Sequence, residues 1–243
     1  MDETWDGIAE WYTRLVRDGS AMHEFSRDIL LALLPQQLAG SSVLDLGCGE
    51  GIVARAVAAR GATVVGIDSS EALIMQARTA ERSHPAGASY HLDSYHLDDG
   101  QSLDTIDDES MDWVVAALSL NNVADLDAAI TAVKRVLKPT GKLAFTVPHP
   151  CFEAPGATFV DMDGTVRRVV GDYRAEGFWR STHPQSVRRA GNYHRTISSY
   201  TAALVDHGFS VEVLAEPAPD ERVIATNPHR AALPPFLLVR VGR

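Results

Sequence analysis

Cysteine is scarce in this chain of 243 residues, which contains only Cys48 and Cys151. Two cysteines are too few for a disulfide framework. Hydrophobic runs are short as well, since none approaches the ~18 consecutive apolar residues of a membrane-spanning helix. The segment MDETWDGIAE at the amino terminus is acidic, whereas a secretory signal begins with basic residues. These absences predict a cytoplasmic protein with no membrane among its partners.

Basic residues are also in deficit. The chain has 22 Lys and Arg against 32 Asp and Glu, which gives a formal net charge of −10 at pH 7. Binding to a nucleic-acid backbone depends on clustered Lys and Arg, so we expect no nucleic acid among the partners. His149 and Cys151 lie close together, but no second Cys/His pair has zinc-ligand spacing, and no metal site is expected.

The overall composition is that of a globular protein, with 45% hydrophobic and 22% charged residues. A chain of this length fits one domain whose α/β sheet is buried on both faces. The sequence contains no internal repeat and no linker that would divide it. We therefore expect residues 1–243 to form a single domain.

The most informative stretch is VLDLGCGEGIVARAVAARGATVVGID, residues 43–68. It combines a buried strand, a glycine-rich turn, a helix and a second strand that ends on an acid. The glycines at 47, 49 and 51 leave room for a ligand against the backbone, and the helix that follows offers unpaired N–H groups. Asp68 lies at the carboxyl edge of the second strand, where a carboxylate can accept hydrogen bonds from two ribose hydroxyls.

The glycine spacing distinguishes this turn from a dinucleotide site. The dinucleotide fingerprint is G-x-G-x-x-G, whereas the order here is G-x-G-x-G with Glu50 inside the loop. A carboxylate is unfavourable beside a pyrophosphate but tolerable beside a cationic sulfonium or an amino group. Asp45 adds a second negative charge at the same edge. The segment D-L-G-C-G-E-G resembles motif I of the class I S-adenosylmethionine-dependent methyltransferases, including their small-molecule, type 11-like members.

The resemblance covers about residues 40–148. Asp68 stands where the family has the acid of its second strand, and Asp93 with Ser94 follows the next strand, where the family places an acid that contacts adenine. The segment RVLKPTGKLAFTV, residues 135–147, resembles the RVLKPGG-strand hallmark of the family, with Thr140 in place of the first glycine.

The resemblance implies S-adenosyl-L-methionine as the cofactor. Its methionine portion is expected at the glycine turn, its ribose at Asp68 and its adenine at Asp93, unless a shift of the third strand brings Asp98 or Asp99 there instead. The expected contacts are Tyr12, Gly47, Cys48, Gly49, Asp68, Ser69, Asp93, Ser94 and Leu118.

The alternation of elements predicts an α/β fold, a Rossmann-like class I methyltransferase sheet that is mostly parallel. The resemblance implies that its last strand is antiparallel. Amino-terminal helices occupy residues 1–40 in this interpretation. The expected strands are 42–46, 63–67, 88–92, 111–117, 142–147, 209–215 and 236–241, and the later helices are 51–60, 70–82, 125–137 and 197–207.

Residues 149–195 break this regular pattern with prolines, glycines and aromatic residues. A loop of this length is functional or disordered, and its aromatic content argues against disorder. Asp163-Gly164 predicts a hairpin turn within residues 159–166. We expect this substrate-side insertion and the helical lid of residues 1–40 to cover a donor-binding core of residues 41–148, with residues 196–243 forming a carboxyl-terminal helix and hairpin.

Three side chains are candidates for a base that acts on the acceptor: Glu24, His96 and His149. Both histidines follow strand ends on the ligand-binding edge, and the family folds the helix that carries Glu24 over its active site. Each also has a plain interpretation as a surface or core residue. The paired histidines that the family carries after the fourth strand are Asn121-Asn122 here, and Asn121 can orient an acceptor by hydrogen bonding.

Aromatic residues in both substrate-facing regions favour a small aromatic acceptor, such as an indole or a phenol, methylated on carbon or oxygen. A nucleic-acid or protein methyltransferase is the first alternative. The acidic charge disfavours it, as does the sequence LSLNN at residues 118–122, where a motif of the Asn/Asp-Pro-Pro-Tyr type would stand. The second alternative is a non-catalytic S-adenosylmethionine-binding protein. The sequence leaves open whether the chain is a monomer or a homodimer.

Overall fold

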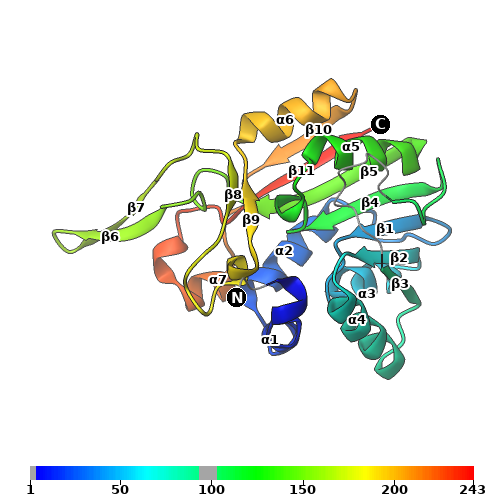
Figure 1. Ribbon diagram of the computed structural model, residues 1–243, viewed down its shortest axis with the longest axis horizontal. Coiled ribbons are helices and arrows are strands. Elements are labelled where there is room, and N and C mark those ends of the chain that lie inside the picture. Colours follow the sequence, from blue (N-terminus) through cyan, green and yellow to red (C-terminus); the bar gives the residue numbers. More distant parts are fainter. Residues whose placement is uncertain (1–3, 93–102) are drawn as a thin grey trace.

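The computed structural model describes residues 4–92 and 103–243. Its centre is a sheet of seven strands in the order β10-β11-β5-β4-β1-β2-β3 (Figure 1). Strand β11 runs antiparallel to both β5 and β10, and the other neighbouring pairs are parallel. The bounds are β1 Ser42–Leu46, β2 Thr63–Asp68, β3 Ala88–Leu92, β4 Met111–Ala117, β5 Leu137–Pro148, β10 Ser210–Ala215 and β11 Phe236–Gly242. The expected mostly parallel sheet with an antiparallel last strand is confirmed.

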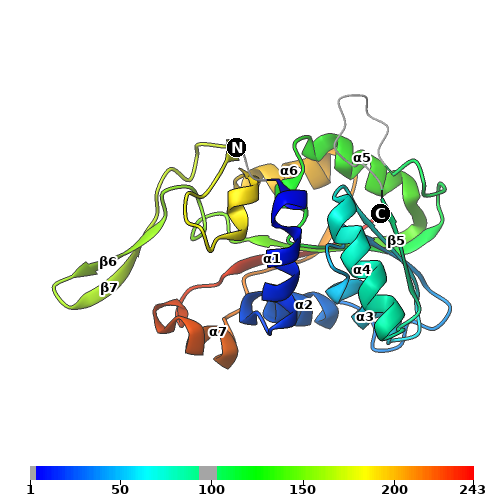
Figure 2. The ribbon, with the colours of Figure 1, turned by 60° about the horizontal axis from the view of Figure 1, so that its bottom comes forward.

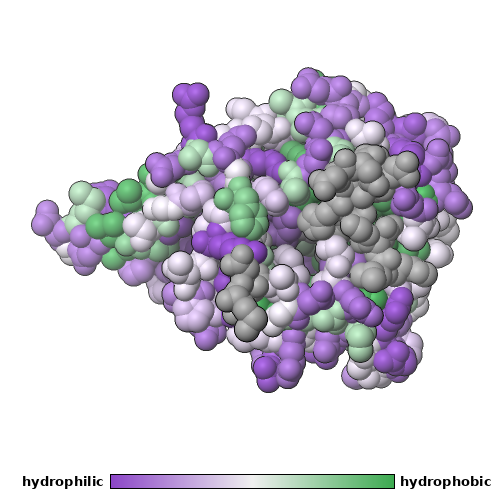
Figure 3. Space-filling view, in the orientation of Figure 1, coloured by the Kyte–Doolittle hydropathy of each residue, from purple (hydrophilic) through white to green (hydrophobic). Residues whose placement is uncertain are grey.

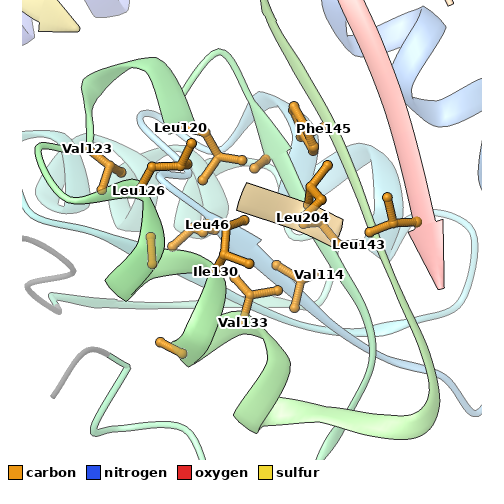
Figure 4. Close-up of a cluster of buried hydrophobic side chains, with 14 of the residues drawn as sticks. Leu46, Val114, Leu120, Val123, Leu126, Ile130, Val133, Leu143, Phe145 and Leu204 are labelled. Carbon is orange, nitrogen blue, oxygen red and sulfur yellow. The ribbon is translucent and has the colours of Figure 1, made fainter. Parts of the chain in front are cut away.

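Helices cover both faces of this sheet. Helices α5 (Leu126–Val136) and α6 (Ile197–Asp206) lie on one face, and α2 (Ala21–Ala32), α3 (Ile52–Ala58) and α4 (Glu71–Ser83) lie on the other (Figure 2). Successive strand residues alternate between the two cores, because side chains in a strand point to opposite faces. Leu44 and Val114 pack under α5, as Figure 4 shows for Val114, while Val43 and Val115 face the opposite core.

Most element boundaries agree with the sequence prediction within two residues, and β5 is the exception. It begins at Leu137, because Leu137 already pairs with Met111, and the ladder becomes regular where Lys142 pairs with Trp113. A Cβ on Gly141 would lie 3.0 Å from the carbonyl oxygens of Met111 and Lys138. The second glycine of the hallmark is therefore required by close packing, whereas Thr140 is exposed and replaces the first without a clash.

Side-chain caps explain where several helices begin. Asp125 accepts a hydrogen bond from the N–H of Ala128 at the start of α5, and Ser70 accepts one from Leu73 at the start of α4. Ser20 occupies the N-cap position of α2, but its side chain caps no helix N–H. Its hydroxyl instead lies 2.8 Å from Nδ1 of His23, so the imidazole takes the place of the helix N–H groups.

The insertion contains more structure than its sequence pattern predicts. The expected hairpin is present as β6 (Thr158–Met162) and β7 (Thr165–Val169), and it projects from the body as an arm with exposed apolar side chains (Figures 1 and 3). The pattern missed β8 (Gly177–Trp179), which pairs with β9 (Asn192–His194). It also missed the short helices η1 (Leu120–Asn122), η2 (Val187–Ala190), α7 (Glu221–Thr226) and η3 (Pro228–Arg230). Elements this short show no periodicity.

Across the described ranges, no helix is both long enough and apolar enough to cross a bilayer.

Candidate functional site

A cavity lies at the carboxyl ends of β1, β2 and β4, beneath helix α1 (Trp5–Arg17). We call it the loop cavity, because the glycine turn after β1 forms one wall. Six of the expected donor contacts come together here: Tyr12, Gly47, Gly49, Asp68, Ser69 and Leu118. The rest of the lining consists of Trp5, Leu73, Ala117, Ser119 and Asn122.

Left-handed backbone shapes this cavity. Gly47 has φ +71° and Gly49 has φ +56°, values that glycine adopts at little cost. Leu118 at the end of β4 has φ +56°, which costs a residue with a side chain roughly 1 kcal/mol or more. Such strain is typical of functional sites. A Cβ on Gly49 would lie 3.5 Å from the Tyr12 ring, so this glycine keeps the space between the turn and α1 open.

Asp68 is held with its carboxylate at the cavity. One oxygen accepts from the Gly49 N–H and the other from the Ser70 N–H, both at 2.9 Å. Burial raises the pKa of Asp68 to about 6, although these backbone N–H groups lower it. Each carboxylate oxygen retains a lone pair for a further donor. The position suits hydrogen bonds from ligand hydroxyls.

Asp45 is a second buried carboxylate behind the same turn. It is 1% exposed, and burial raises its pKa to about 7. Its Oδ2 has no hydrogen-bond partner within the described ranges. Asp45 is only partly ionised near pH 7 and does not line the loop cavity, so Asp68 supplies most of the negative charge there, in a region of low dielectric. This environment favours a cationic ligand over a neutral one of the same shape.

Glu50, whose carboxylate would be tolerable beside a cationic ligand, has its charge balanced within the chain. Its carboxylate pairs with Arg55 at 2.9 Å, and Nε of Arg17 lies 3.4 Å away. The chain therefore supplies the balancing positive charges itself, and Glu50 does not line the loop cavity. Its role in this structure is to fasten the turn to α3 and α1.

Cys48 is the one expected contact at the glycine turn that does not line the cavity. Its side chain is 5% exposed and packs in the core with Tyr90, on the far side of the turn. Its N–H donates to the Ile67 carbonyl at 2.9 Å. Neither group is free to contact a ligand in the loop cavity.

Helix α1 covers the loop cavity with aromatic side chains. Trp5 and Tyr12 meet edge to face with ring centroids 5.5 Å apart, and Tyr12 meets His23 at 5.3 Å. Burial raises the pKa of Tyr12, and Glu50 and Asp68 raise it further, so its phenol is neutral. The sequence pattern did not point to Trp5. Its distance of seven residues from Tyr12, two helical turns on the same face, was the signal that could have found it.

Polar contacts fasten α1 in place. Oδ1 of Asp6 accepts from the Ser70 hydroxyl at 2.6 Å and from the Ala72 N–H at 3.1 Å. Trp11 stacks under the guanidinium of Arg189 at 4.0 Å, which joins α1 to the η2 segment of the insertion (Figure 2, dark blue beside yellow). The two segments predicted to form a lid therefore contact each other beside the loop cavity.

Replacing Asp6 by alanine should loosen this fastening. Two hydrogen bonds to an exposed carboxylate contribute about 1 kcal/mol together, which corresponds to roughly fivefold faster amide exchange in α1. Hydrogen exchange read by mass spectrometry measures this. Glu10→Ala is the matched control, because Glu10 lies on the same helix and, among residues 4–92 and 103–243, pairs only with Arg14 one turn away. Unchanged exchange of α1 in Asp6→Ala would show that other contacts hold the helix.

A second cavity, which we call the insertion cavity, lies on the other side of η1. Asn122 lines the loop cavity, whereas its neighbour Asn121 lines the insertion cavity, so η1 forms the wall between them. The other lining residues are Pro148, His149, Pro150, Glu153, Trp179, Asn192, Tyr193, His194, Arg195 and Tyr200. Most come from the turn after β5 and from β9.

His149 reaches the insertion cavity, but the chain uses both of its ring nitrogens. Nδ1 accepts from the N–H groups of Cys151 at 3.2 Å and Phe152 at 3.4 Å. Nε2 lies 2.7 Å from Oε1 of Glu216, and it carries the proton because Nδ1 is an acceptor. This arrangement suits a residue that orders the turn after β5.

Glu24 lies outside both cavities. Its carboxylate pairs with Arg222 at 3.1 Å, and the same guanidinium reaches Asp28 at 2.7 Å, which ties α2 to α7. The structure does not bring Glu24 together with the cavity residues. His96, Asp93 and Ser94 lie outside the described residues.

Glu153 joins the parts of the insertion. Its carboxylate is buried and pairs with Arg168 at 3.5 Å and Arg188 at 3.0 Å, and also with Arg230. These three arginines keep the pKa of Glu153 below its usual range against the effect of burial. One carboxylate thus connects the β7 arm, η2 and η3 beside the insertion cavity.

The loop cavity encloses only about 40 Å³ in this structure, but the chemistry of its lining suits a sulfonium donor that carries a ribose. Asp68 offers acceptors for hydroxyls, and the unpaired oxygen of Asp45 lies behind the glycine turn. Gly47 and Gly49 allow close approach of the ligand to the backbone. Trp5 and Tyr12 supply apolar surface on the facing side.

Comparison with known proteins agrees with this geometry. Residues 44–145 match the family described as "Methyltransferase domain". The N-demethylindolmycin N-methyltransferase of Streptomyces griseus is 33% identical over 209 residues, which are 82% of this chain and 79% of that protein. A ubiquinone biosynthesis O-methyltransferase of Pseudomonas fluorescens (strain SBW25) is 36% identical over 109 residues, 45% of each chain.

Solved structures show the same architecture. An S-adenosylmethionine-dependent methyltransferase from Mesorhizobium loti matches with a TM-score of 0.73 at 28% identity, over 93% of this chain and 99% of that one. A putative methyltransferase of the same type from Listeria monocytogenes matches with a TM-score of 0.70 at 27% identity, over 90% of this chain and 97% of that one.

Proposed function

Because this chain belongs to the class I S-adenosylmethionine-dependent methyltransferases, we propose that it methylates a small aromatic acceptor, such as an indole or a phenol, held in the insertion cavity. The observation that carries the proposal is that Asn121 and Asn122, neighbours in η1, line the two cavities. The short helix η1 separates the loop cavity from a cavity lined by the aromatic side chains of Trp179, Tyr193 and Tyr200. The insertion cavity encloses only about 10 Å³ in this structure, so the proposal requires that η1 and the insertion move apart until an acceptor beside Asn121 touches a donor beside Asn122.

In this proposal, some residues of the chain bind the donor and others position it. When bound, S-adenosyl-L-methionine supplies an already activated methyl group, so the protein mainly contributes proximity and alignment. Asp68 would hold the ribose hydroxyls, and the glycine turn would seat the methionine portion. Trp5 and Tyr12 exclude water from the loop cavity on the α1 side. Asn122 is fixed by a hydrogen bond of 3.1 Å from its Nδ2 to the Leu118 carbonyl.

A small acceptor is favoured over a macromolecular one. Helix α1 and the η2 segment contact each other through Trp11 and Arg189. This contact leaves less room for a macromolecule to reach the loop cavity. The net charge of −10 opposes binding of nucleic acid. The names of the relatives are consistent with a small acceptor, since indolmycin and ubiquinone precursors are small molecules.

A screen with isotopically labelled S-adenosyl-L-methionine tests the proposal. The protein is incubated with panels of indoles, phenols, quinones and amines, and in parallel with RNA and protein extracts, and the products are read by mass spectrometry. We expect label in an aromatic small molecule. Label in RNA or protein alone would overturn the acceptor class. Donor binding without transfer to any panel would support the non-catalytic alternative.

A further inference from the structure

His194 has the arrangement of an oriented base. It lies on β9, is 5% exposed and lines the insertion cavity. Its Nε2 lies 2.7 Å from the backbone carbonyl oxygen of Tyr173. A carbonyl oxygen only accepts hydrogen bonds, so Nε2 must carry a proton. In the neutral ring, Nδ1 therefore holds the lone pair.

His194 differs from His149 in the hydrogen bonds made by Nδ1. Nδ1 of His149 accepts two backbone hydrogen bonds, whereas Nδ1 of His194 makes no hydrogen bond with any residue in 4–92 or 103–243. The Tyr173 ring packs edge to face against the imidazole at 6.1 Å and restrains its orientation. A base needs this combination of a fixed ring and a free lone pair.

Asn121 is the second polar group with an unmet hydrogen bond in the insertion cavity. It is 7% exposed, and its Nδ2 donates to Oδ1 of Asn122 at 3.0 Å. Its Oδ1 has no partner in the described part of the chain. The amide is not rotated by 180°, because its Oδ1 would then face Oδ1 of Asn122, whose Nδ2 donates to the Leu118 carbonyl. A buried polar atom without a partner is costly, and a polar ligand group would relieve the cost.

We propose that His194 is the base that removes the N–H or O–H proton of the acceptor. In this proposal Asn121 orients the acceptor, because its Oδ1 accepts a hydrogen bond from that N–H or O–H group or from a polar group next to it. This inference rests on the proposed function. The acceptor proton passes to Nδ1, and the electron pair it leaves forms the new bond to the methyl carbon. The methyl–sulfur bond breaks with its electrons on sulfur, which becomes a neutral thioether. The imidazolium then releases its proton to water.

Several charged or titratable groups surround His194. Glu176 interacts with it electrostatically, and Tyr173 contacts its ring. Arg195, Glu153 and His149 line the same cavity. The pH dependence of turnover in the wild type must therefore be compared with that of the His194 variant, because the other groups titrate in both proteins.

Histidine NMR on the 15N-labelled protein, saturated with S-adenosylhomocysteine, tests the site without knowledge of the natural acceptor. The probes are indole with 1-methylindole, and phenol with anisole. We expect the Nε2–H tautomer at His194. We also expect indole or phenol to shift its Nδ1 resonance and to bind at least tenfold more tightly than the methylated counterpart, which lacks the donor. An Nδ1–H tautomer, or equal binding within both pairs, would overturn the proposal.

Kinetics provide the second test with any acceptor that the screen identifies. In His194→Gln, the side-chain amide can still donate to the Tyr173 carbonyl, but no base remains. We expect kcat to fall about 10²–10⁴-fold, the usual loss for a general base, with donor affinity unchanged and the acidic limb of the pH profile lost. Asn121→Ala should raise KM for the acceptor more than it lowers kcat.

His207→Gln is the matched control, because His207 also bonds a backbone carbonyl, Ala203 at 2.7 Å, but lies outside both cavities. Full turnover in His194→Gln would overturn the inference and leave the proposed function intact. Absence of transfer by the wild type would instead overturn the proposed function. The NMR result on the wild type decides the base assignment even if His194→Gln fails to fold.

Discussion

Replacing Gly49 by valine should abolish donor binding, with a loss of affinity of at least ~100-fold. Two effects combine. The residue has φ +56°, where a β-branched side chain is strained. Its Cβ would lie 3.5 Å from the ring of Tyr12, so the two methyl groups of valine would extend into the loop cavity. Isothermal titration with S-adenosylhomocysteine measures the loss directly.

Gly40→Val separates strain from occlusion. Gly40 has φ +81°, but a Cβ there meets nothing within 4 Å. We expect this control to lose roughly 1–2 kcal/mol of folding stability through strain while it keeps the affinity of the parent for the donor product. Tight binding by Gly49→Val would show that the donor does not occupy the loop cavity.

Replacing Asp68 should cause the second large loss of donor affinity. Asp68→Ala removes an acceptor for two ligand hydroxyls, and the loss of charged hydrogen bonds corresponds to roughly 1.5–3 kcal/mol, or about 10–150-fold in affinity. Asp68→Asn is the informative companion, because its amide oxygen can still accept from one of the two backbone N–H groups that the carboxylate now binds. If both variants bound the donor as the parent does, Asp68 would have only a structural role.

The raised pKa of Asp68 makes the donor affinity depend on pH. Its carboxylate has a pKa of about 6, raised chiefly by burial. As pH falls from 7 to 5, the group becomes protonated and loses capacity to accept hydrogen bonds, so affinity should decrease. Asp68→Asn should remove this dependence. Asp45→Asn tests the contribution of the other buried carboxylate, whose pKa is about 7.

Folding stability should change in the opposite direction over the same range. A carboxyl whose pKa is higher in the folded state than in the unfolded state destabilises the fold when both states are ionised. This penalty is present above the folded pKa of about 6 for Asp68 and is relieved as pH falls toward its ordinary value of 3.8. Thermal unfolding of the ligand-free protein at pH 7 and pH 5 measures the effect, and Asp68→Asn should reduce it.

The donor-binding core follows from local sequence. The strand, glycine turn, helix and acid of residues 43–68 lie where the pattern predicts, because each depends on neighbours in the chain. Alternating apolar residues specify a strand, left-handed turns require glycine, and an acid at the end of β2 must lie at the carboxyl edge of the sheet. The family and the cofactor are confirmed from these same residues.

The choice among candidate side chains depended on tertiary contacts. Nδ1 of His149 is occupied by the N–H groups of its own turn, whereas the proton on Nε2 is fixed in both histidines by distant groups, Glu216 for His149 and the Tyr173 carbonyl for His194. Glu50 pairs with Arg55, five residues away, and also with Arg17 on α1, 33 residues away, whereas Glu24 pairs with Arg222, 198 residues away. Strands β8 and β9 are too short for a pattern and exist because they pair with each other. Local sequence determines how a segment folds, whereas the protonation and pairing of a side chain depend on which distant groups the packed chain brings to it.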